Sequence, residues 1–190
     1  MSRVVAIGSS WGGMQALKTV LGALPADFPS PIFVAQHRDP DAEDDLLAHL
    51  LARHLSLAVA DAGHGDEVRP GRVLLAPPGY HLLVDDGTVS LSVDEPVQFA
   101  RPSIDVLFES VAGTFASDCV GVILTGANAD GAAGLAEIKR RGGYTIVQDP
   151  KTAERPEMPL AALAAEPDAV LPLERIAAAV QEVCGVEGVR

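Results

Sequence analysis

Short runs rich in Val and Ile alternate with segments of helical periodicity, and this alternation constrains the fold more than any other feature of the chain. Parallel strands need long crossover connections, which are usually helices, so the alternation predicts a parallel sheet. The expected strands are residues 4–7, 32–35, 57–60, 120–124 and 144–147, with a short strand around Val170. The expected helices lie near residues 14–24, 46–51, 104–111, 159–166 and 176–183, with one from about Gly131.

The rhythm changes in the stretch RVLLAPPGYHLLVDDGTVSLSV, which begins at Arg72. It contains extended runs on either side of Asp86-Gly87, and Asp-Gly between such runs is typical of a hairpin. We therefore expect an antiparallel excursion near residues 72–93. The predicted fold class is α/β, a doubly wound, mostly parallel sheet in a three-layer αβα sandwich with an inserted antiparallel hairpin. A chain of 190 residues, 48% of them hydrophobic, is expected to form a single domain over residues 1–190.

Charge and cysteine content exclude several classes of function. The formal net charge of −12 argues against nucleic-acid binding and against binding to anionic membranes, since both require basic patches. Only two cysteines are present, Cys119 and Cys184, and Cys119 opens an apolar run typical of a core strand. The start MSRVV passes directly into the first strand, and no apolar run approaches the roughly 20 residues of a membrane span. We expect a cytoplasmic protein without direct membrane insertion.

Polar side chains follow three of the predicted strands. Ser10 follows the first, His37 ends the run IFVAQH, and Asp130 lies just beyond VGVILTG. Ligands of open parallel sheets bind at the carboxyl ends of the strands, so these three side chains are expected at the reactive edge. A hydroxyl, an imidazole and a carboxylate are the groups that acyl transfer needs. The spacing Gly8-Ser9-Ser10-Trp11-Gly12 also fits the G-x-S-x-G turn that exposes a nucleophilic serine.

Each of these residues also has a purely structural interpretation. The glycine-rich segment could be a strand-to-helix turn, His37 a polar residue leaving a strand, and Asp130 the N-cap of the following helix. Their coincidence at three strand ends favours a site. The other histidines considered, His49, His54 and His64, are expected at the surface or in a loop. No spacing of metal ligands, phosphate loop or dinucleotide motif is present, so neither a metal nor a cofactor is expected.

The order Ser10, His37, Asp130 departs from ordinary α/β-hydrolases, which run Ser, Asp, His. The chain instead resembles the catalytic domain of CheB-type chemotaxis protein-glutamate methylesterases. The resemblance extends from residue 4 to about 184. It rests on four motifs, GSSWGG, the dipeptide QH at residues 36 and 37, RPSIDVLF, and GVILTGANADGAAG.

The resemblance implies Ser10 as nucleophile, His37 as general base and acid, and Asp130 as the carboxylate that orients it. It further implies hydrolysis of glutamyl γ-methyl esters on methyl-accepting chemoreceptor helices, with release of methanol and without a cofactor. Many members also deamidate receptor glutamines. The family commonly carries an N-terminal receiver domain, and this chain begins at its catalytic domain. Regulation by phosphorylation in cis is therefore not expected, which leaves room for a regulator in trans.

Two departures from the family pattern affect the expected pocket. Trp11 replaces a small threonine beside the nucleophile, and Ala127 replaces a methionine. Trp11, Gly12, Ala127 and Arg101 are expected to contribute to the substrate or oxyanion site. Two alternatives to a receptor methylesterase stay open: a CheB-like esterase or deamidase with a substrate outside chemotaxis, and a catalytically idle binding module. The complete Ser-His-Asp set argues against the idle module.

Overall fold

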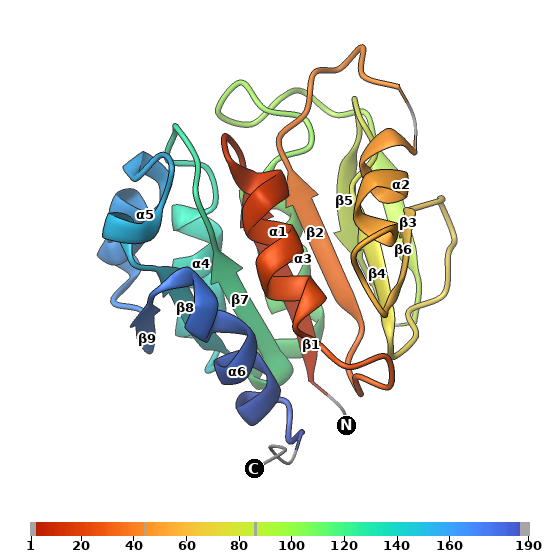
Figure 1. Ribbon diagram of the computed structural model, residues 1–190. Helices are drawn as coiled ribbons and strands as arrows, with labels where there is room; N and C mark the ends of the chain where they lie inside the picture. Colours follow the sequence, from red (N-terminus) through yellow and green to blue (C-terminus); the bar gives the residue numbers. More distant parts are fainter. Residues whose placement is uncertain (1–2, 44, 86, 187–190) are drawn as a thin grey trace.

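The structure is a computed structural model that describes residues 3–43, 45–85 and 87–186, and its centre is a sheet of seven parallel strands (Figure 1). The strands are β1 (Val4–Ser9), β2 (Ile32–Gln36), β3 (Ala58–Asp61), β4 (Arg72–Leu75), β7 (Cys119–Ile123), β8 (Tyr144–Gln148) and β9 (Ala169–Leu171). Their order across the sheet is β3-β4-β2-β1-β7-β8-β9. The central strand β1 is buried along its whole length, as a parallel strand covered on both faces must be.

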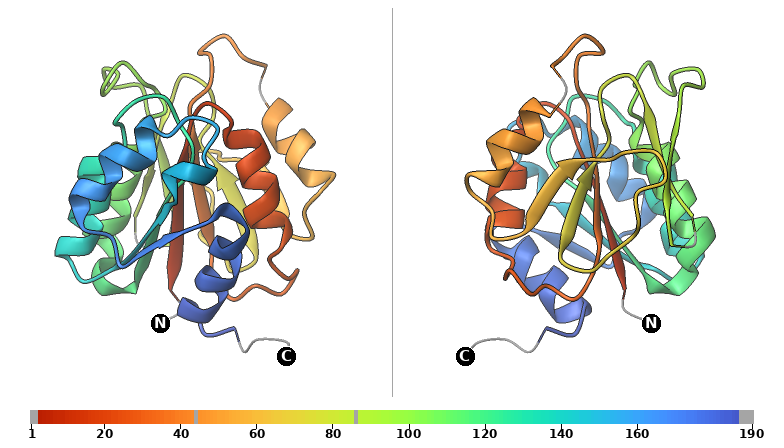
Figure 2. Two further views of the ribbon diagram at one scale, coloured as in Figure 1. Left: turned by 60° about the vertical axis from the view of Figure 1, so that its left-hand side comes forward. Right: turned by 90° about the vertical axis from the view of Figure 1, so that its right-hand side faces the viewer.

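Helices cover both faces of the sheet (Figure 2). They are α1 (Gly13–Gly22), α2 (Leu46–Ala52), α3 (Ile104–Phe115), α4 (Ala132–Arg140), α5 (Glu157–Ala162) and α6 (Leu173–Val183). Short 3-10 helices occupy Ala116–Asp118, Pro150–Thr152 and Leu163–Ala165. Successive side chains of β1 point to opposite faces, so Val5 and Ile7 pack with α1, α2 and α6, while Val4 and Ala6 pack with α3, α4 and α5. The predicted three-layer sandwich is confirmed.

The inserted hairpin is also confirmed, but it is shorter than predicted. It consists of β5 (His81–Val84) and β6 (Val89–Ser92), paired antiparallel. In the predicted turn, Gly87 has the positive φ of 87° that favours glycine, and Asp86 lies outside the described residues.

The prediction that the antiparallel excursion begins at residue 72 was wrong. Arg72–Leu75 is the parallel strand β4, which lies between β3 and β2. Its last three residues are all buried, because a strand inside a parallel sheet is covered on both faces. The prolines of the following segment, Pro77 and Pro78, lack the N–H that would continue the ladder, so the run divides there into two separate strands.

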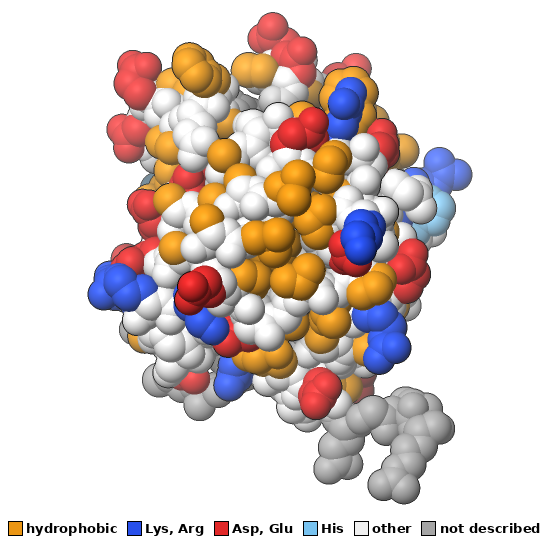
Figure 3. Space-filling model, turned by 90° about the vertical axis from the view of Figure 1, so that its left-hand side faces the viewer, with side chains coloured by type: hydrophobic (Ala, Val, Ile, Leu, Met, Phe, Trp, Pro, Cys, Tyr) orange, Lys and Arg blue, Asp and Glu red, His pale blue; other side chains and the backbone are white. Residues whose placement is uncertain are grey.

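The side of the molecule that carries α5 and β9 gathers hydrophobic side chains at its surface (Figure 3). Leu160 of α5 is 53% exposed and Val170 of β9 is 44% exposed. β9 is the last strand of the sheet.

Within the described ranges, the structure contains no helix that is both long and apolar enough to cross a lipid bilayer.

Parallel pairing brings three loops together at one edge of the sheet. β1 pairs with β2 on one side and with β7 on the other. The register places Ser9 opposite Gln36, so the residues that follow them, Ser10 and His37, leave the sheet side by side. The loop after β7 leaves from the same edge, at the carboxyl ends of the strands (Figure 1). This edge is where an open α/β sheet binds its ligands.

Candidate active site

Ser10 lies at the turn between β1 and α1. Its backbone N–H donates to the carbonyl of Thr125 at 2.9 Å, which ties the turn to the loop after β7. Gly12 precedes the first residue of α1 with a φ of 77°, a conformation that favours glycine. A Cβ at Gly12 would lie 2.7 Å from a carboxylate oxygen of Glu154. The glycine therefore allows both the turn and the approach of the Glu154 side chain.

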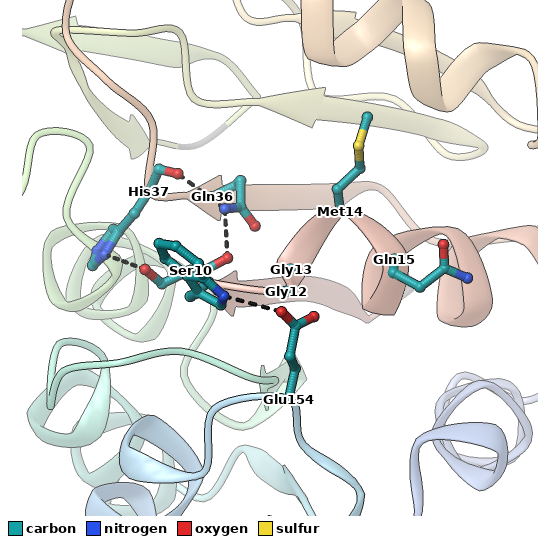
Figure 4. A pocket seen from close by; sticks show the side chains of 9 residues that line it. Ser10, Gly12, Gly13, Met14, Gln15, Gln36, His37 and Glu154 are labelled. Atoms are coloured by element: carbon teal, nitrogen blue, oxygen red, sulfur yellow. Dashed lines mark hydrogen bonds between the residues drawn. The ribbon is translucent and has the colours of Figure 1, made fainter.

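Gln36 fixes the backbone on which the serine and the histidine are carried (Figure 4). Its side-chain nitrogen donates to the carbonyls of Ser10, at 2.8 Å, and of His37, at 2.9 Å. Its side-chain oxygen accepts from the hydroxyl of Ser9 at 2.6 Å. A Cβ at Gly13 would lie 1.9 Å from this oxygen, so only glycine leaves room for the amide. Gln36 had no predicted role beyond its place in a motif.

The imidazole of His37 lies between Ser10 and Asp130. Its Nδ1 is 3.2 Å from the Ser10 hydroxyl (Figure 4), and its Nε2 is 2.7 Å from Oδ2 of Asp130. The His37 side chain is 14% exposed, whereas that of Asp130 is fully buried. When Nε2 carries the proton and donates it to the carboxylate, Nδ1 presents its lone pair to the serine hydroxyl. The structure thus brings the three predicted residues together in one hydrogen-bonded series.

Asp130 accepts three further hydrogen bonds, all from the start of α3. The donors are the hydroxyl of Ser103 at 2.9 Å, the N–H of Ile104 at 2.7 Å and the N–H of Asp105 at 3.0 Å. The interpretation of Asp130 as the N-cap of its own following helix was wrong. Gly131 occupies that position with a φ of 96°, without a side-chain cap. The Asp130 carboxylate instead lies at the N-terminus of a different helix.

These donors keep the Asp130 carboxylate ionised. Burial by itself raises the pKa of a carboxyl group, because it disfavours the charged form. The hydrogen bond from His37 and those from the backbone of Ile104 and Asp105 outweigh burial, so the pKa of Asp130 lies below its ordinary value. An ionised carboxylate is the form that can hold an imidazole in one orientation and stabilise it when it gains a proton.

An open pocket of about 520 Å³ lies over the serine. It is lined by Ser10, Trp11, Gly12, Gly13, Met14, Gln15, Gln36, His37 and Glu154. Trp11 is 60% exposed, and its indole N–H donates to the Glu154 carboxylate at 3.0 Å. The guanidinium of Arg155 lies over the ring at 5.5 Å. Trp11 therefore borders the pocket while its ring is held by the neighbouring loop.

Two of the residues expected at the pocket are not among its lining residues. Ala127 is exposed in the loop after β7. The guanidinium of Arg101 donates to the carbonyls of Val93, at 2.8 Å, and of Asp94, at 3.0 Å. These bonds hold the loop before α3, and the structure does not place the Arg101 side chain against the pocket.

Two residues of the site had little or no signal in the sequence. Ser103 precedes α3 and accepts from the N–H of Val106, the usual pattern of a serine N-cap, and it could have been found on that basis. Glu154 lies in a loop without a motif of its own, and only the fold brings it to Trp11.

The remaining titratable candidates lie outside this arrangement. His49, His54 and His64 are exposed. Cys119 is buried in β7, and burial raises the pKa of its thiol to about 11, so it is unsuited to act as a nucleophile at neutral pH. Among the residues that the structure describes, no group of three or more His, Cys, Asp or Glu side chains could hold a metal ion.

Comparison with known proteins gives one consistent family. The family model described as CheB methylesterase matches residues 5–180. The solved catalytic domain of the Thermotoga maritima CheB methylesterase superposes with a TM-score of 0.89, at 33% identity, over 98% of this chain and 99% of that one.

Curated relatives agree with this match. A protein of Leptospira interrogans, provisionally named protein-glutamate methylesterase/protein-glutamine glutaminase, is 45% identical over 91% of this chain and 90% of its own length. A protein of Anaeromyxobacter dehalogenans with the same two activities in its name is 46% identical over 95% of this chain, which spans 53% of that protein. The protein-glutamate methylesterase FrzG of Myxococcus xanthus is 42% identical over 94% of this chain and 54% of its own length.

Proposed function

The chain belongs to the CheB methylesterase family, and we propose that it hydrolyses the γ-methyl esters of glutamates on a methyl-accepting chemoreceptor. The names of the relatives supply the reaction class, protein-glutamate methylester hydrolysis. The observation that carries the proposal on this chain is the hydrogen-bonded series from Ser10 through His37 to the buried carboxylate of Asp130. These groups lie beside a pocket open enough to admit a side chain from another protein.

The geometry supports a two-step reaction through an acyl-enzyme. His37 accepts the hydroxyl proton as Ser10 Oγ attacks the ester carbonyl carbon, and a tetrahedral intermediate forms. The intermediate then expels the methoxy group, which takes the proton from His37 and leaves as methanol. A water molecule, deprotonated by His37, attacks the resulting glutamyl-serine ester. Collapse of this second intermediate returns the proton to Ser10 and releases the glutamate side chain.

The negative charge of each intermediate needs hydrogen-bond donors close to Ser10. In the part of the chain that the structure describes, the backbone N–H groups of Trp11 and Ala127 have no hydrogen-bond acceptor. Trp11 follows the nucleophile at the N-terminal end of α1, where unpaired N–H groups and the helix dipole favour an anion. We assign the oxyanion to the Trp11 N–H, with the Ala127 N–H as a second donor from the loop that the hydrogen bond from Ser10 to Thr125 ties to the nucleophile. Because the Ala127 donor is a backbone group, replacement of the family's methionine by alanine leaves it in place.

Deamidation of receptor glutamines is a second reaction that the same site supports. Two of the relatives described above carry protein-glutamine glutaminase in their names. A glutamine amide passes through the same acyl-enzyme, with His37 giving its proton to the departing amino group, which leaves as ammonia, instead of to the methoxy group. The two substrates therefore differ only in the leaving group.

Mass spectrometry of receptor peptides tests the proposal. Receptor-containing membranes, methylated beforehand, are incubated with the purified protein and digested. We expect specific glutamates to lose their methyl groups, and some glutamines to become glutamates. Unchanged receptor peptides, together with hydrolysis of a small activated ester, would assign the protein to another substrate. Unchanged peptides without any ester hydrolysis would favour the idle binding module.

A further inference from the structure

His81 is buried in the hairpin strand β5, with 1% of its surface exposed, and it does not line the pocket. Both of its ring nitrogens are used. Nδ1 accepts from the backbone N–H of Ser103 at 3.2 Å, and Nε2 lies 3.1 Å from the carbonyl of Glu95. A nitrogen that accepts an N–H bond carries no proton, so the proton is on Nε2 and is donated to Glu95. The surroundings therefore require a neutral ring in a single tautomer.

His81 accepts a hydrogen bond from Ser103, which is the first of three consecutive residues that donate hydrogen bonds to Asp130. Ser103 is the N-cap of α3, and its hydroxyl donates to Oδ1 of Asp130 at 2.9 Å. The next two backbone N–H groups along the chain, those of Ile104 and Asp105, donate to the same carboxylate. Three of the four donors to Asp130 thus belong to a segment whose first residue is fixed by His81.

We propose that His81 is a positioning residue for the reaction, which acts through Ser103 on the orientation of the Asp130 carboxylate. It touches neither the substrate pocket nor the reacting atoms. Small displacements of a catalytic group lower turnover because the reaction needs closely defined geometry. Such groups are kept in place by hydrogen bonds from the residues that surround them. The inference rests on the proposed function, since it takes Asp130 as the carboxylate that orients His37.

Two substitutions separate the bond to Ser103 from the bond to Glu95. His81→Asn keeps an oxygen near the place of Nδ1, so it can still accept from Ser103. His81→Gln keeps a donor near the place of Nε2 and loses the acceptor. His64→Gln is the matched control, because the exposed His64 also accepts a backbone N–H through Nδ1, from Leu91 at 3.3 Å. That bond joins the loop after β3 to the same hairpin and does not lead to Asp130.

The readout is hydrolysis of p-nitrophenyl acetate, with thermal melting of each variant. We expect His81→Gln to lose about tenfold in kcat with KM unchanged, roughly the effect of one misplaced hydrogen bond. His81→Asn is expected to recover most of this loss, and the His64→Gln control to match the wild type. Equal losses for Asn and Gln, or wild-type turnover for a folded His81→Gln variant, would overturn the proposal.

A second variant decides the question if His81→Gln does not fold. Ser103→Ala keeps the backbone N–H bonded to His81 and removes the hydroxyl that reaches Asp130. We expect a similar loss in kcat at constant KM, and wild-type turnover would contradict the route through Ser103.

Proton NMR gives a readout that does not depend on activity. The ring N–H that His37 shares with Asp130 should give a far-downfield resonance in the wild type and in His81→Asn, shifted or broadened in a folded His81→Gln variant. An unchanged resonance in that variant would count against the proposal, even if the protein proves to have a different substrate.

Discussion

Asp130 and Asp105 each accept a backbone N–H from the first turn of a helix: Asp130 from α3, which contains Asp105, and Asp105 from α4, which follows Asp130. The Asp130 carboxylate accepts the N–H of Asp105 in α3 at 3.0 Å, and the Asp105 carboxylate accepts the N–H of Gly134 in α4 at 2.7 Å. The first turns of two neighbouring helices are thereby joined through carboxylates that satisfy their unpaired N–H groups. The residue proposed to orient His37 is thus also part of the structural link between α3 and α4.

Asp130→Asn should lower both turnover and stability. The carboxylate now accepts hydrogen bonds from N–H and O–H groups. In Asn, an amide nitrogen takes the place of one carboxylate oxygen and faces at least one of these groups. Buried donors are then left unpaired. We expect a loss of about 1–3 kcal/mol in the free energy of unfolding. Turnover should fall on the order of ten-thousand-fold, as it does in a well-studied serine protease triad. Urea unfolding and ester hydrolysis measure the two effects, and wild-type turnover in the folded variant would leave Asp130 a structural role alone.

The stability supplied by Asp130 should depend on pH in a defined direction. Its pKa in the folded protein lies below the ordinary value of about 3.9, which is expected for the unfolded chain. The contribution is therefore complete above about pH 4.5 and is lost as the pH falls through the lower, folded-state pKa. The difference in unfolding free energy between the wild type and Asp130→Asn should stay constant from pH 7 to about pH 4.5 and narrow below it. A difference that narrows already between pH 7 and pH 5 would contradict the lowered pKa.

Cys119 should be unreactive in the folded protein. With a pKa of about 11, roughly one thiol in a thousand is ionised at pH 8, and the side chain is buried in β7. In a Cys184→Ser variant, Cys119 is the only remaining thiol of the chain. Iodoacetamide at pH 8 should label this variant readily in urea and very slowly without it. Rapid labelling of the native protein would show that this region of the core is open.

Trp11→Thr should affect a protein substrate more than a small one. The indole borders the pocket and is fixed by the Glu154 carboxylate and the Arg155 guanidinium, so we interpret it as a rigid wall against which the receptor chain is seated. Turnover of methylated receptor should change several-fold more than turnover of p-nitrophenyl acetate. Val170→Thr, at an exposed position of the edge strand β9, is the control and should change neither. If Trp11→Thr changes the turnover of both substrates by the same factor, a role of Trp11 in recognising the receptor is excluded.

Much of the fold and the candidate site followed from the sequence because local patterns encode them. The alternation of strand and helix segments predicts a parallel sheet, and such a sheet brings the ends of β1, β2 and β7 to one edge. This is why Ser10, His37 and Asp130 could be predicted to meet. The strand β4 was misjudged because Pro77 and Pro78 mark a break in the extended run without indicating that the part before them pairs parallel with β2 and β3.

The contacts behind the site could not be predicted, because they join residues far apart in the chain. Nothing local to Asp130 indicates that its carboxylate meets the N-terminus of α3, and a cap of its own helix was the simpler expectation. The same holds for Glu154, which reaches Trp11 across 143 positions of sequence. Such contacts depend on where the loops lie once the sheet has formed.

The central claim is that Ser10 is the nucleophile of a receptor methylesterase. It is tested most directly by methanol release from methyl-labelled receptor membranes, with the wild type beside Ser10→Ala. The wild type should release labelled methanol. Ser10→Ala should lower the rate by roughly a million-fold, to background, with an almost unchanged melting temperature, because the hydroxyl contacts His37 and is not part of the core. Release by Ser10→Ala at the wild-type rate would contradict the account.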